Sequence, residues 1–112
     1  MYQFSFYVPE THLEQVKTAL FAAGAGHLNG YDQCCWQMRG EGQFRALAGS
    51  QPFVGQIGQL QKLPEYKVEM VCSELLVKEV ILTLLRVHPY EQPAYAVCKI
   101  LTLDDFLSNL PR

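Results

Sequence analysis

The chain carries an internal repeat, and this repeat restricts the fold more than any other feature. Shifting the sequence by 64 positions aligns six identical residues among the 37 pairs that begin at Tyr2, where ordinary composition predicts about two. The identical pairs are Tyr2 with Tyr66, Glu10 with Glu74, Val16 with Val80, Leu20 with Leu84, Tyr31 with Tyr95, and Cys34 with Cys98. Six identities do not prove a duplication, but they indicate two halves of similar design.

The first half reads as a strand, a helix and a second strand. Residues 2–8 read as a half-buried strand, with Phe4, Phe6 and Val8 on one face and Ser5 and Tyr7 on the other. The following segment has apolar residues at helical spacing: Leu13, Val16, Leu20 and Ala23. The helix is expected to stop at Gly24, and a glycine-rich turn leads to a strand over residues 31–38.

The second half repeats this order. Residues 67–72 predict a strand, Ser73 an N-cap, residues 74–87 a helix and residues 94–101 a final strand. Two such halves predict an α+β fold, the ferredoxin-like βαββαβ sandwich. In that fold two helices cover one face of an antiparallel four-stranded sheet.

We expect residues 1–112 to form a single domain with a core over residues 2–101. Residues 39–66 are too rich in glycine and proline for a tight hairpin, so they predict a long connection, and long connections are usually functional or mobile. A short helical tail is expected over residues 102–112, with Thr102 as its cap. Three apolar residues of the tail should pack on the body or on a neighbouring subunit: Phe106, Leu107 and Leu110.

Charge and composition exclude several classes of function. Hydrophobic residues make up 49% of the chain, which excludes intrinsic disorder. The net charge is −2 and no two basic residues are adjacent, which argues against nucleic-acid binding. No apolar stretch reaches membrane-spanning length and the N-terminus lacks signal-peptide features, so we expect a cytoplasmic protein. Only 18% of the residues are charged, which indicates a large core or an interface.

The four cysteines predict free thiols, because none forms a C-x-x-C pair and the chain has no secretory features. Neighbouring residues of a strand point to opposite faces, so Cys34 and Cys35 are not expected to bind one metal ion together.

Fold topology brings one pair of loops together. The loop after the first helix and the loop after the second should lie at opposite ends of the sheet, which separates His27 from His88. The central connection leaves the second strand at the same end as residues 88–93. We therefore predict a composite ligand site there, built from His88, Tyr90, Glu91 and Tyr95 together with Gly40, Gly42, Phe44 and Arg45.

His88 has two interpretations. Pro89 ends the helix, so the imidazole can cap the last carbonyls of that helix. Alternatively, His88 and Glu91 converge on a ligand or on a divalent metal. Two ligands do not complete a metal site, so a neighbouring subunit would have to add His27, Asp32 or a cysteine.

The segment around Gly40 and Gly42 resembles a phosphate-binding loop only in part. It lacks the third glycine of a dinucleotide motif and the Lys-Ser/Thr of a P-loop. A bulged strand end is the simpler interpretation, and Arg45 is the best anion anchor nearby. No spacing indicates a catalytic nucleophile, so we predict no catalytic residue.

An ordered series of segments resembles a known family. The segments are Phe6-Tyr7-Val8-Pro9-Glu10, residues 20–26, Gly30-Tyr31-Asp32-Gln33-Cys34, Gly40-x-Gly42-x-Phe44-Arg45, Gly49 with Pro52-Phe53-x-Gly55, and His88-Pro89-Tyr90-Glu91-x-Pro93-Ala94-Tyr95. Together they resemble the domain inserted within bacterial members of the Nif-three-like family. That insert is similar to the PII and CutA proteins, whose ferredoxin-like subunits form trimers.

The resemblance implies a binding or regulatory role. Longer family members are dinuclear-metal proteins, sometimes labelled cyclohydrolases, whose metal ligands flank the insert; this sequence has no such segments. We therefore expect a non-enzymatic, free-standing homotrimeric module that senses a small ligand or metal ion or docks on a protein partner. The alternatives are a metal-dependent hydrolase with a site at a subunit interface, and a purely structural interaction protein. The sequence identifies no cofactor beyond the candidate divalent metal.

Overall fold

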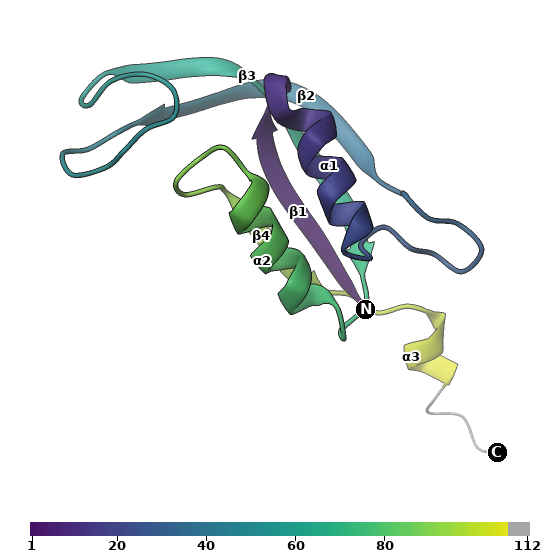
Figure 1. The fold of residues 1–112 in the computed structure, drawn as a ribbon. Helices are drawn as coiled ribbons and strands as arrows, with labels where there is room; N and C mark the ends of the chain where they lie inside the picture. Colours follow the sequence, from purple (N-terminus) through teal and green to yellow (C-terminus); the bar gives the residue numbers. More distant parts are fainter. Residues whose placement is uncertain (108–112) are drawn as a thin grey trace.

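The computed structural model describes residues 1–107, which form one sheet, two long α-helices, a short third α-helix and one turn of 3-10 helix (Figure 1). The strands are β1 (Tyr2–Pro9), β2 (Trp36–Arg45), β3 (Leu60–Cys72) and β4 (Tyr95–Lys99). The helices are η1 (Glu10–His12), α1 (Leu13–Ala22), α2 (Val77–Val87) and α3 (Leu103–Leu107). None of the helices in this part of the chain has the length and apolar character of a membrane span.

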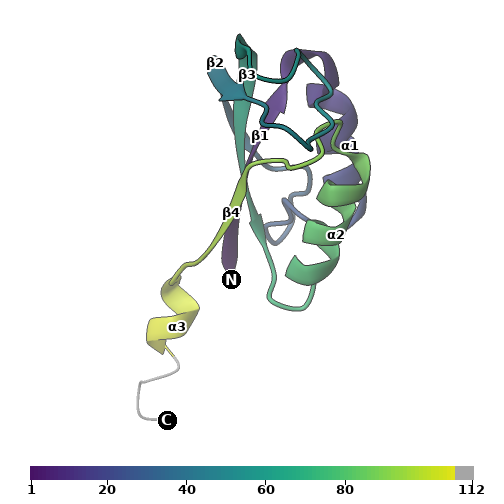
Figure 2. The same ribbon diagram turned by 90° about the vertical axis from the view of Figure 1, so that its left-hand side faces the viewer.

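The sheet confirms the predicted α+β, ferredoxin-like architecture. Its strand order is β2-β3-β1-β4, and every neighbouring pair is antiparallel. Figure 2 shows α1 and α2 together on one face of the sheet. Within residues 1–107, no helix covers the opposite face.

The core lies between β1, β3 and the two helices, where strand alternation meets helical spacing. On β1, Phe4, Phe6 and Val8 are fully buried, and Val68 and Met70 of β3 lie opposite two of them in register. The helices contribute pairs that the sequence repeat aligns: Val16 with Val80 and Leu20 with Leu84, all fully buried. The repeat therefore corresponds to equivalent core positions in β1 and β3 and in α1 and α2.

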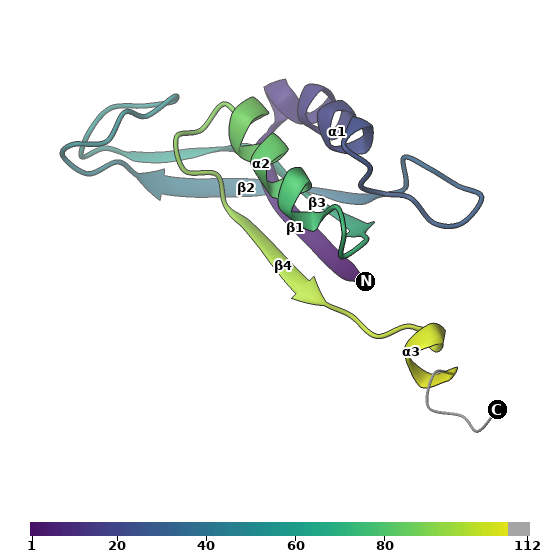
Figure 3. The ribbon, with the colours of Figure 1, turned by 60° about the horizontal axis from the view of Figure 1, so that its bottom comes forward.

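The central connection is much shorter than the expected residues 39–66. β2 and β3 pair continuously from Trp36 with Glu69 to Arg45 with Leu60, so residues 46–59 alone connect them. The ribbon runs past the end of β1, which pairs with β3 only as far as Pro9 with Glu65 (Figure 3). Because this outer part of the ribbon has no sheet neighbour and packs under no helix, its sequence lacks the apolar alternation of a half-buried strand. We call residues 46–59 the hairpin loop.

Several predicted boundaries were wrong. β2 begins at Trp36 and not at residue 31, and β4 is limited to Tyr95–Lys99. Ser73 does not cap α2, because a turn comes first: the Ser73 carbonyl accepts a hydrogen bond from Leu76 N–H, and the helix begins at Val77.

The C-terminal tail differs from expectation in its packing. In α3 the Asp105 carboxylate accepts a hydrogen bond from Thr102 N–H at 2.8 Å, so the acidic side chain provides the cap. Phe106 and Leu107 are exposed in the single chain and so are not buried against its body, and their packing on a neighbouring subunit stays a prediction. Leu110 lies outside the described residues.

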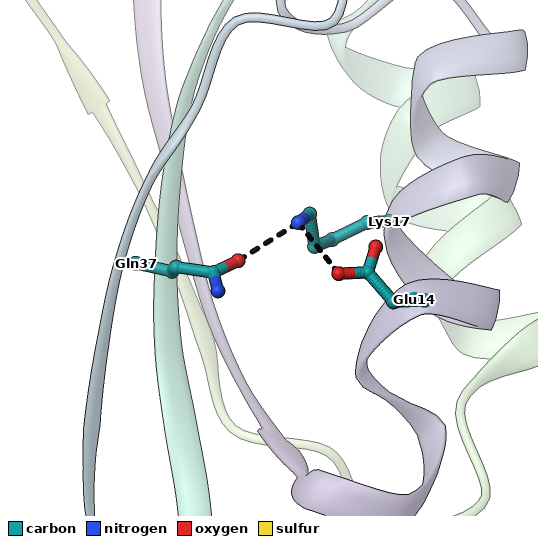
Figure 4. Close-up of polar contacts among 3 residues, drawn as sticks. All are labelled: Glu14, Lys17 and Gln37. Carbon is teal, nitrogen blue, oxygen red and sulfur yellow. Dashed lines mark hydrogen bonds and ion pairs between the residues drawn. The ribbon is translucent and has the colours of Figure 1, made fainter.

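A half-buried lysine attaches α1 to the edge strand β2. Lys17 Nζ donates to Gln37 Oε1 at 2.8 Å and lies 3.2 Å from Glu14 Oε1 on its own helix (Figure 4). The Lys17 side chain is only 13% exposed, so its charge needs both partners. This contact positions β2, which lies outside the apolar core, relative to the helices.

Burial predicts opposite outcomes for two adjacent leucines of α2. Leu84 is 0% exposed and Leu85 is 46% exposed. We expect Leu84→Ala to lower the free energy of unfolding by about 2–5 kcal/mol, because it leaves a core cavity. Leu85→Ala should cost less than about 1 kcal/mol. Urea unfolding followed by circular dichroism measures both, and equal losses would contradict the packing described above.

Candidate functional site

A cavity of about 580 Å³ lies at the end of the sheet where the hairpin loop meets residues 88–94. We call residues 88–94 the histidine loop; in Figure 1 it lies beneath the outer part of the β2–β3 ribbon. The cavity is lined by residues of β1, β2, β3 and both loops: Tyr7, Gln43, Phe44, Arg45, Ala46, Leu47, Ser50, Gln51, Pro52, Phe53, Glu65, Tyr90, Glu91, Gln92 and Ala94. Aromatic and aliphatic side chains form much of the wall.

His88 attaches the histidine loop to the sheet. Its Nδ1 accepts a hydrogen bond from Tyr90 N–H at 3.0 Å, so the ring proton is on Nε2, which donates to the Tyr7 carbonyl at 2.7 Å. The residue is 6% exposed, and burial lowers the pKa of the imidazole. His88 does end α2, through its backbone N–H to the Leu84 carbonyl, but its ring bonds to β1 and to its own loop.

Tyr90 is the central aromatic residue of the cavity wall. Its ring centroid lies 5.9 Å from that of Phe44, 6.4 Å from that of Phe53 and 5.0 Å from that of His88. Its hydroxyl is buried and has no hydrogen-bond partner among residues 1–107. Burial raises the pKa of Tyr90, and the nearby Glu65 raises it further. The phenol is therefore neutral, and its nearest acceptor, the Glu65 carboxylate, is not aligned with it in a full hydrogen bond, which is unusual for a buried polar group.

Gly42 makes room for Glu65. A Cβ atom at Gly42 would overlap the carboxylate of Glu65, whose side chain lies across β2 at that point. Any other residue at position 42 would displace the carboxylate from the cavity. Gly40 has open space around the corresponding position, so it plays no equivalent part.

Glu91 joins the two loops. Its Oε2 accepts a hydrogen bond from Gln51 N–H of the hairpin loop at 3.0 Å. The hairpin loop is also attached to η1, because the ring centroids of Phe53 and His12 lie 5.3 Å apart in an edge-on arrangement. Both walls of the cavity are thus fixed to other parts of the fold.

The structure brings half of the predicted site residues together. Phe44, Arg45, Tyr90 and Glu91 all line the cavity. Tyr95 lies elsewhere and stacks on Phe4, with ring centroids 6.1 Å apart. His88 does not line the cavity but bonds to Tyr7 and Tyr90, which do. Gly42 makes room for Glu65, and Gly40 has open space where a side chain would be.

Within a single subunit, His88 is not available as a metal ligand. Both ring nitrogens of His88 are hydrogen-bonded to the main chain, so neither is free for a metal ion. In residues 1–107, no group of three or more His, Cys, Asp or Glu side chains is placed to hold one. We therefore do not carry the metal-ligand role of His88 and Glu91 into our proposal.

Sequence reasoning missed Glu65, Gln51 and Phe53 as site residues. Glu65 lies in a strand that was predicted to be a loop, and its role depends on a glycine of the neighbouring strand. Gln51 contributes only its backbone N–H, which no side-chain pattern reveals. Phe53 could have been found, because an aromatic residue between Pro52 and Gly55 in a polar loop is an exposed apolar anchor.

A second, smaller cavity of about 310 Å³ lies toward the other end of the sheet. Its lining includes Leu28, Cys34, Cys35 and Trp36. Cys35 is an exposed free thiol and Cys34 a half-buried one, as predicted. This end also holds the loop after α1, whose Gly26 N–H donates to the Val71 carbonyl. His27 and His88 therefore lie at opposite ends, as expected.

Similar sequences are found within longer proteins. No protein-family model matches the chain. A GTP cyclohydrolase 1 type 2 homolog from Bacillus subtilis is 41% identical over 91 residues, which cover 81% of this chain and 24% of the relative. The equivalent protein from Halalkalibacterium halodurans is 39% identical over 95 residues, covering 85% of this chain and 26% of the relative. The chain thus spans about a quarter of the length of the curated relatives it matches.

Solved structures give the same result. A Bacillus cereus protein related to NIF3 superposes with a TM-score of 0.75 and 34% identity, over 88% of this chain and 25% of that one. CutA from Xylella fastidiosa superposes with a TM-score of 0.66 and 17% identity, over 96% of this chain and 90% of that one. The first match confirms the resemblance to a segment of the Nif-three-like family, and the second shows a shared fold.

The bonding of His88 predicts a pH-dependent stability. Because burial lowers its pKa in the folded state, the unfolded chain binds the proton more readily. The free energy of unfolding should therefore be highest above the unfolded pKa of about 6.5 and fall as the pH drops below it, by at most about 1.4 kcal/mol per pH unit. Urea unfolding between pH 8 and pH 5 measures this slope.

Matched variants assign the slope to this residue. His88→Gln should flatten the profile, whereas His27→Gln should leave it unchanged because that residue lies at the other end of the sheet. An unchanged slope in His88→Gln would show that the imidazole is not the titrating group.

Proposed function

We propose that this chain, a relative of one segment of the Nif-three-like proteins, is a non-enzymatic binding or regulatory module whose cavity takes a small ligand. The observation that carries the proposal is the buried, unpartnered hydroxyl of Tyr90 in the wall of a 580 Å³ cavity. Buried polar groups are normally hydrogen-bonded, so a missing partner here is explained by a ligand.

The cavity has the properties of small-molecule sites. Its volume lies within the roughly 300–1,000 Å³ that such sites occupy. Apolar and aromatic side chains provide the wall, and a few polar groups, among them Arg45, Glu65 and Glu91, provide direction. The two loops are held by main-chain bonds to His88 and Glu91, so the wall exists before a ligand arrives.

The alternative of a metal-dependent hydrolase has less support. It relied on His88 as a metal ligand or base, and both nitrogens of that ring are engaged in holding the loop. The relatives named GTP cyclohydrolase 1 type 2 homolog are about four times longer than this chain, so their activity is not extended to it.

We further propose that the module is a homo-oligomer, most simply a trimer, located in the cytoplasm. The sheet face opposite the helices carries exposed apolar side chains, Tyr7 on β1 and Trp36 and Met38 on β2, with Lys67 and Glu69 of β3 between the two strands. Trp36 is 66% exposed, which is a large apolar surface to leave in water. A second copy covering this face would bury it, and would account for the low proportion of charged residues.

Size-exclusion chromatography with light scattering tests the assembly. We expect the native protein to have three times the monomer mass at micromolar concentration. Trp36→Glu should give a folded monomer, because Trp36 pairs in register with Glu69 and a covering subunit would have to bury a second, unpaired carboxylate beside it. Leu75→Glu is the control, since Leu75 is 94% exposed and lies outside the sheet. A native monomer, or an undissociated Trp36→Glu variant, would contradict this assembly.

An uncharged aromatic probe tests the cavity itself. We expect 2-(indol-3-yl)ethanol, titrated into the ¹⁵N-labelled native protein, to shift the backbone amide signals of Gln51, Tyr90 and Glu91. Phe53→Ser should weaken binding about fivefold or more, because Phe53 is half-exposed and contributes stacking area without supporting the core.

Tyr31→Ser is the matched control, because it removes an exposed aromatic residue that lies outside the lining of this cavity. It should leave the affinity unchanged within twofold. Shifts confined to residues 28–36, or binding that survives Phe53→Ser, would reject the proposed cavity.

A further inference from the structure

We propose that the ligand of this cavity is an aromatic compound carrying a protonated amine, with the ammonium group bound between Glu65 and Tyr90. This inference rests on the proposed binding function and specifies the chemical class of the ligand. It follows from the charges that line the cavity, from the position of Glu65 and from the rings around it.

The cavity carries an excess of negative charge that nothing in residues 1–107 neutralises. Glu65 and Glu91 line it, against one cation, Arg45. The ion pairs of the described chain use other carboxylates: Lys17 with Glu14, Arg39 with Glu10, and Lys67 with Glu69. A carboxylate that is part-buried in a largely apolar wall is costly unless a cation meets it. The ligand is the remaining source of that cation.

Glu65 lies where it can meet such a group. Its carboxylate lies over Gly42, where any larger residue would collide with it. The same carboxylate is close enough to Tyr90 to raise the pKa of the phenol, yet no hydrogen bond satisfies the buried hydroxyl. A bound ammonium group can donate one proton to the carboxylate and another to the phenol oxygen. The carboxylate then meets a cation, and the phenol oxygen accepts from the ammonium group while its own O–H faces the Glu65 carboxylate.

The aromatic wall favours a cation as well. The ring centroids of Phe44 and Phe53 lie 5.9 Å and 6.4 Å from the ring centroid of Tyr90. Ring faces carry partial negative charge and attract ammonium groups, most strongly where water is excluded. The same rings stack on an aromatic group of the ligand.

Arg45 does not reverse this preference. It follows Phe44 in β2, and consecutive residues of a strand point to opposite faces. Its guanidinium therefore leaves the strand on the other side from the ring that contacts Tyr90. It has no ion pair with either carboxylate of the cavity and is exposed to solvent. We place it at the edge of the cavity, away from Glu65.

Three probes with the same ring and different charge test the ammonium assignment: tryptamine (cation), 2-(indol-3-yl)ethanol (neutral) and indole-3-acetate (anion). Amide chemical shifts of the native protein at pH 7 and low salt give each dissociation constant. We expect tryptamine to bind about tenfold more tightly than the neutral probe, which is the size of a charge-assisted hydrogen bond, and the anion to bind most weakly. Added salt should reduce the preference for the cation.

Charge-neutralising variants locate the effect. Glu65→Gln should remove most of the preference for tryptamine while leaving the affinity for the neutral probe within twofold. Arg45→Gln should retain the preference. Glu74→Gln, which removes an exposed carboxylate at the start of the β3–α2 turn, controls for net charge and should also retain it.

A lysine side chain of another polypeptide would offer the same ammonium group without the ring. Nα-acetyl-lysine N-methylamide represents it, and we expect it to bind more weakly than tryptamine. Tighter binding of the lysine derivative would overturn the assignment of an aromatic small molecule. Tighter binding of indole-3-acetate or of the neutral probe within the cavity would overturn the ammonium assignment and leave the proposed function standing. Failure of all three indole probes to bind the cavity would overturn both.

Discussion

The carbonyl of Tyr7 determines how the functional end of the molecule is built. β1 lies between β3 and β4, and β4 pairs with it only as far as Phe6 with Tyr95. Tyr7 N–H donates a hydrogen bond to the Ala94 carbonyl at 3.1 Å, but the Tyr7 carbonyl has no strand amide opposite it. An unpaired main-chain acceptor at a covered strand end is costly, and His88 satisfies it. That bond joins the loop that carries Tyr90 and Glu91 to β1, and the bond from Gln51 N–H to Glu91 joins the same loop to the hairpin loop.

The fold could be predicted because its information is local and repeated. Val16, Leu20, Val80 and Leu84 follow helical spacing in two segments of matching design, and all four are fully buried. The second strand of each half does not follow the repeat. Tyr31 aligns with Tyr95, yet β2 begins only at Trp36. The repeat therefore predicts elements held by the common core and fails for strands whose limits depend on their neighbours in the sheet.

The site could be predicted in its location but not in its chemistry. Topology alone placed the histidine loop beside the end of β2, and Phe44, Arg45, Tyr90 and Glu91 indeed share one cavity. The role of His88 depended on which carbonyl the sheet leaves unpaired, and that is a property of strand length. The role of Glu65 depended on Gly42 across the ribbon, in a segment whose lack of apolar alternation concealed two paired strands.

At each end of the sheet a loop amide is joined to a strand carbonyl, but the two ends do this differently. The difference explains where the larger cavity lies. The repeat aligns Val71 with Tyr7 and Gly26 with Tyr90. At one end, Gly26 N–H donates directly to the Val71 carbonyl at 2.8 Å. At the other, the equivalent amide and carbonyl are joined through His88, whose ring accepts from Tyr90 N–H and donates to Tyr7. The imidazole thus holds the second loop one ring width farther from its strand. Glycine at position 26 permits close approach, since a Cβ there would meet the Cys34 carbonyl and the Phe21 ring. Tyr90, displaced by the imidazole, instead directs its side chain toward Phe44 and Phe53. The two halves of the fold are similar, but the larger cavity lies at only one end of the sheet. At that end the His88 ring stands between the loop amide and the strand carbonyl.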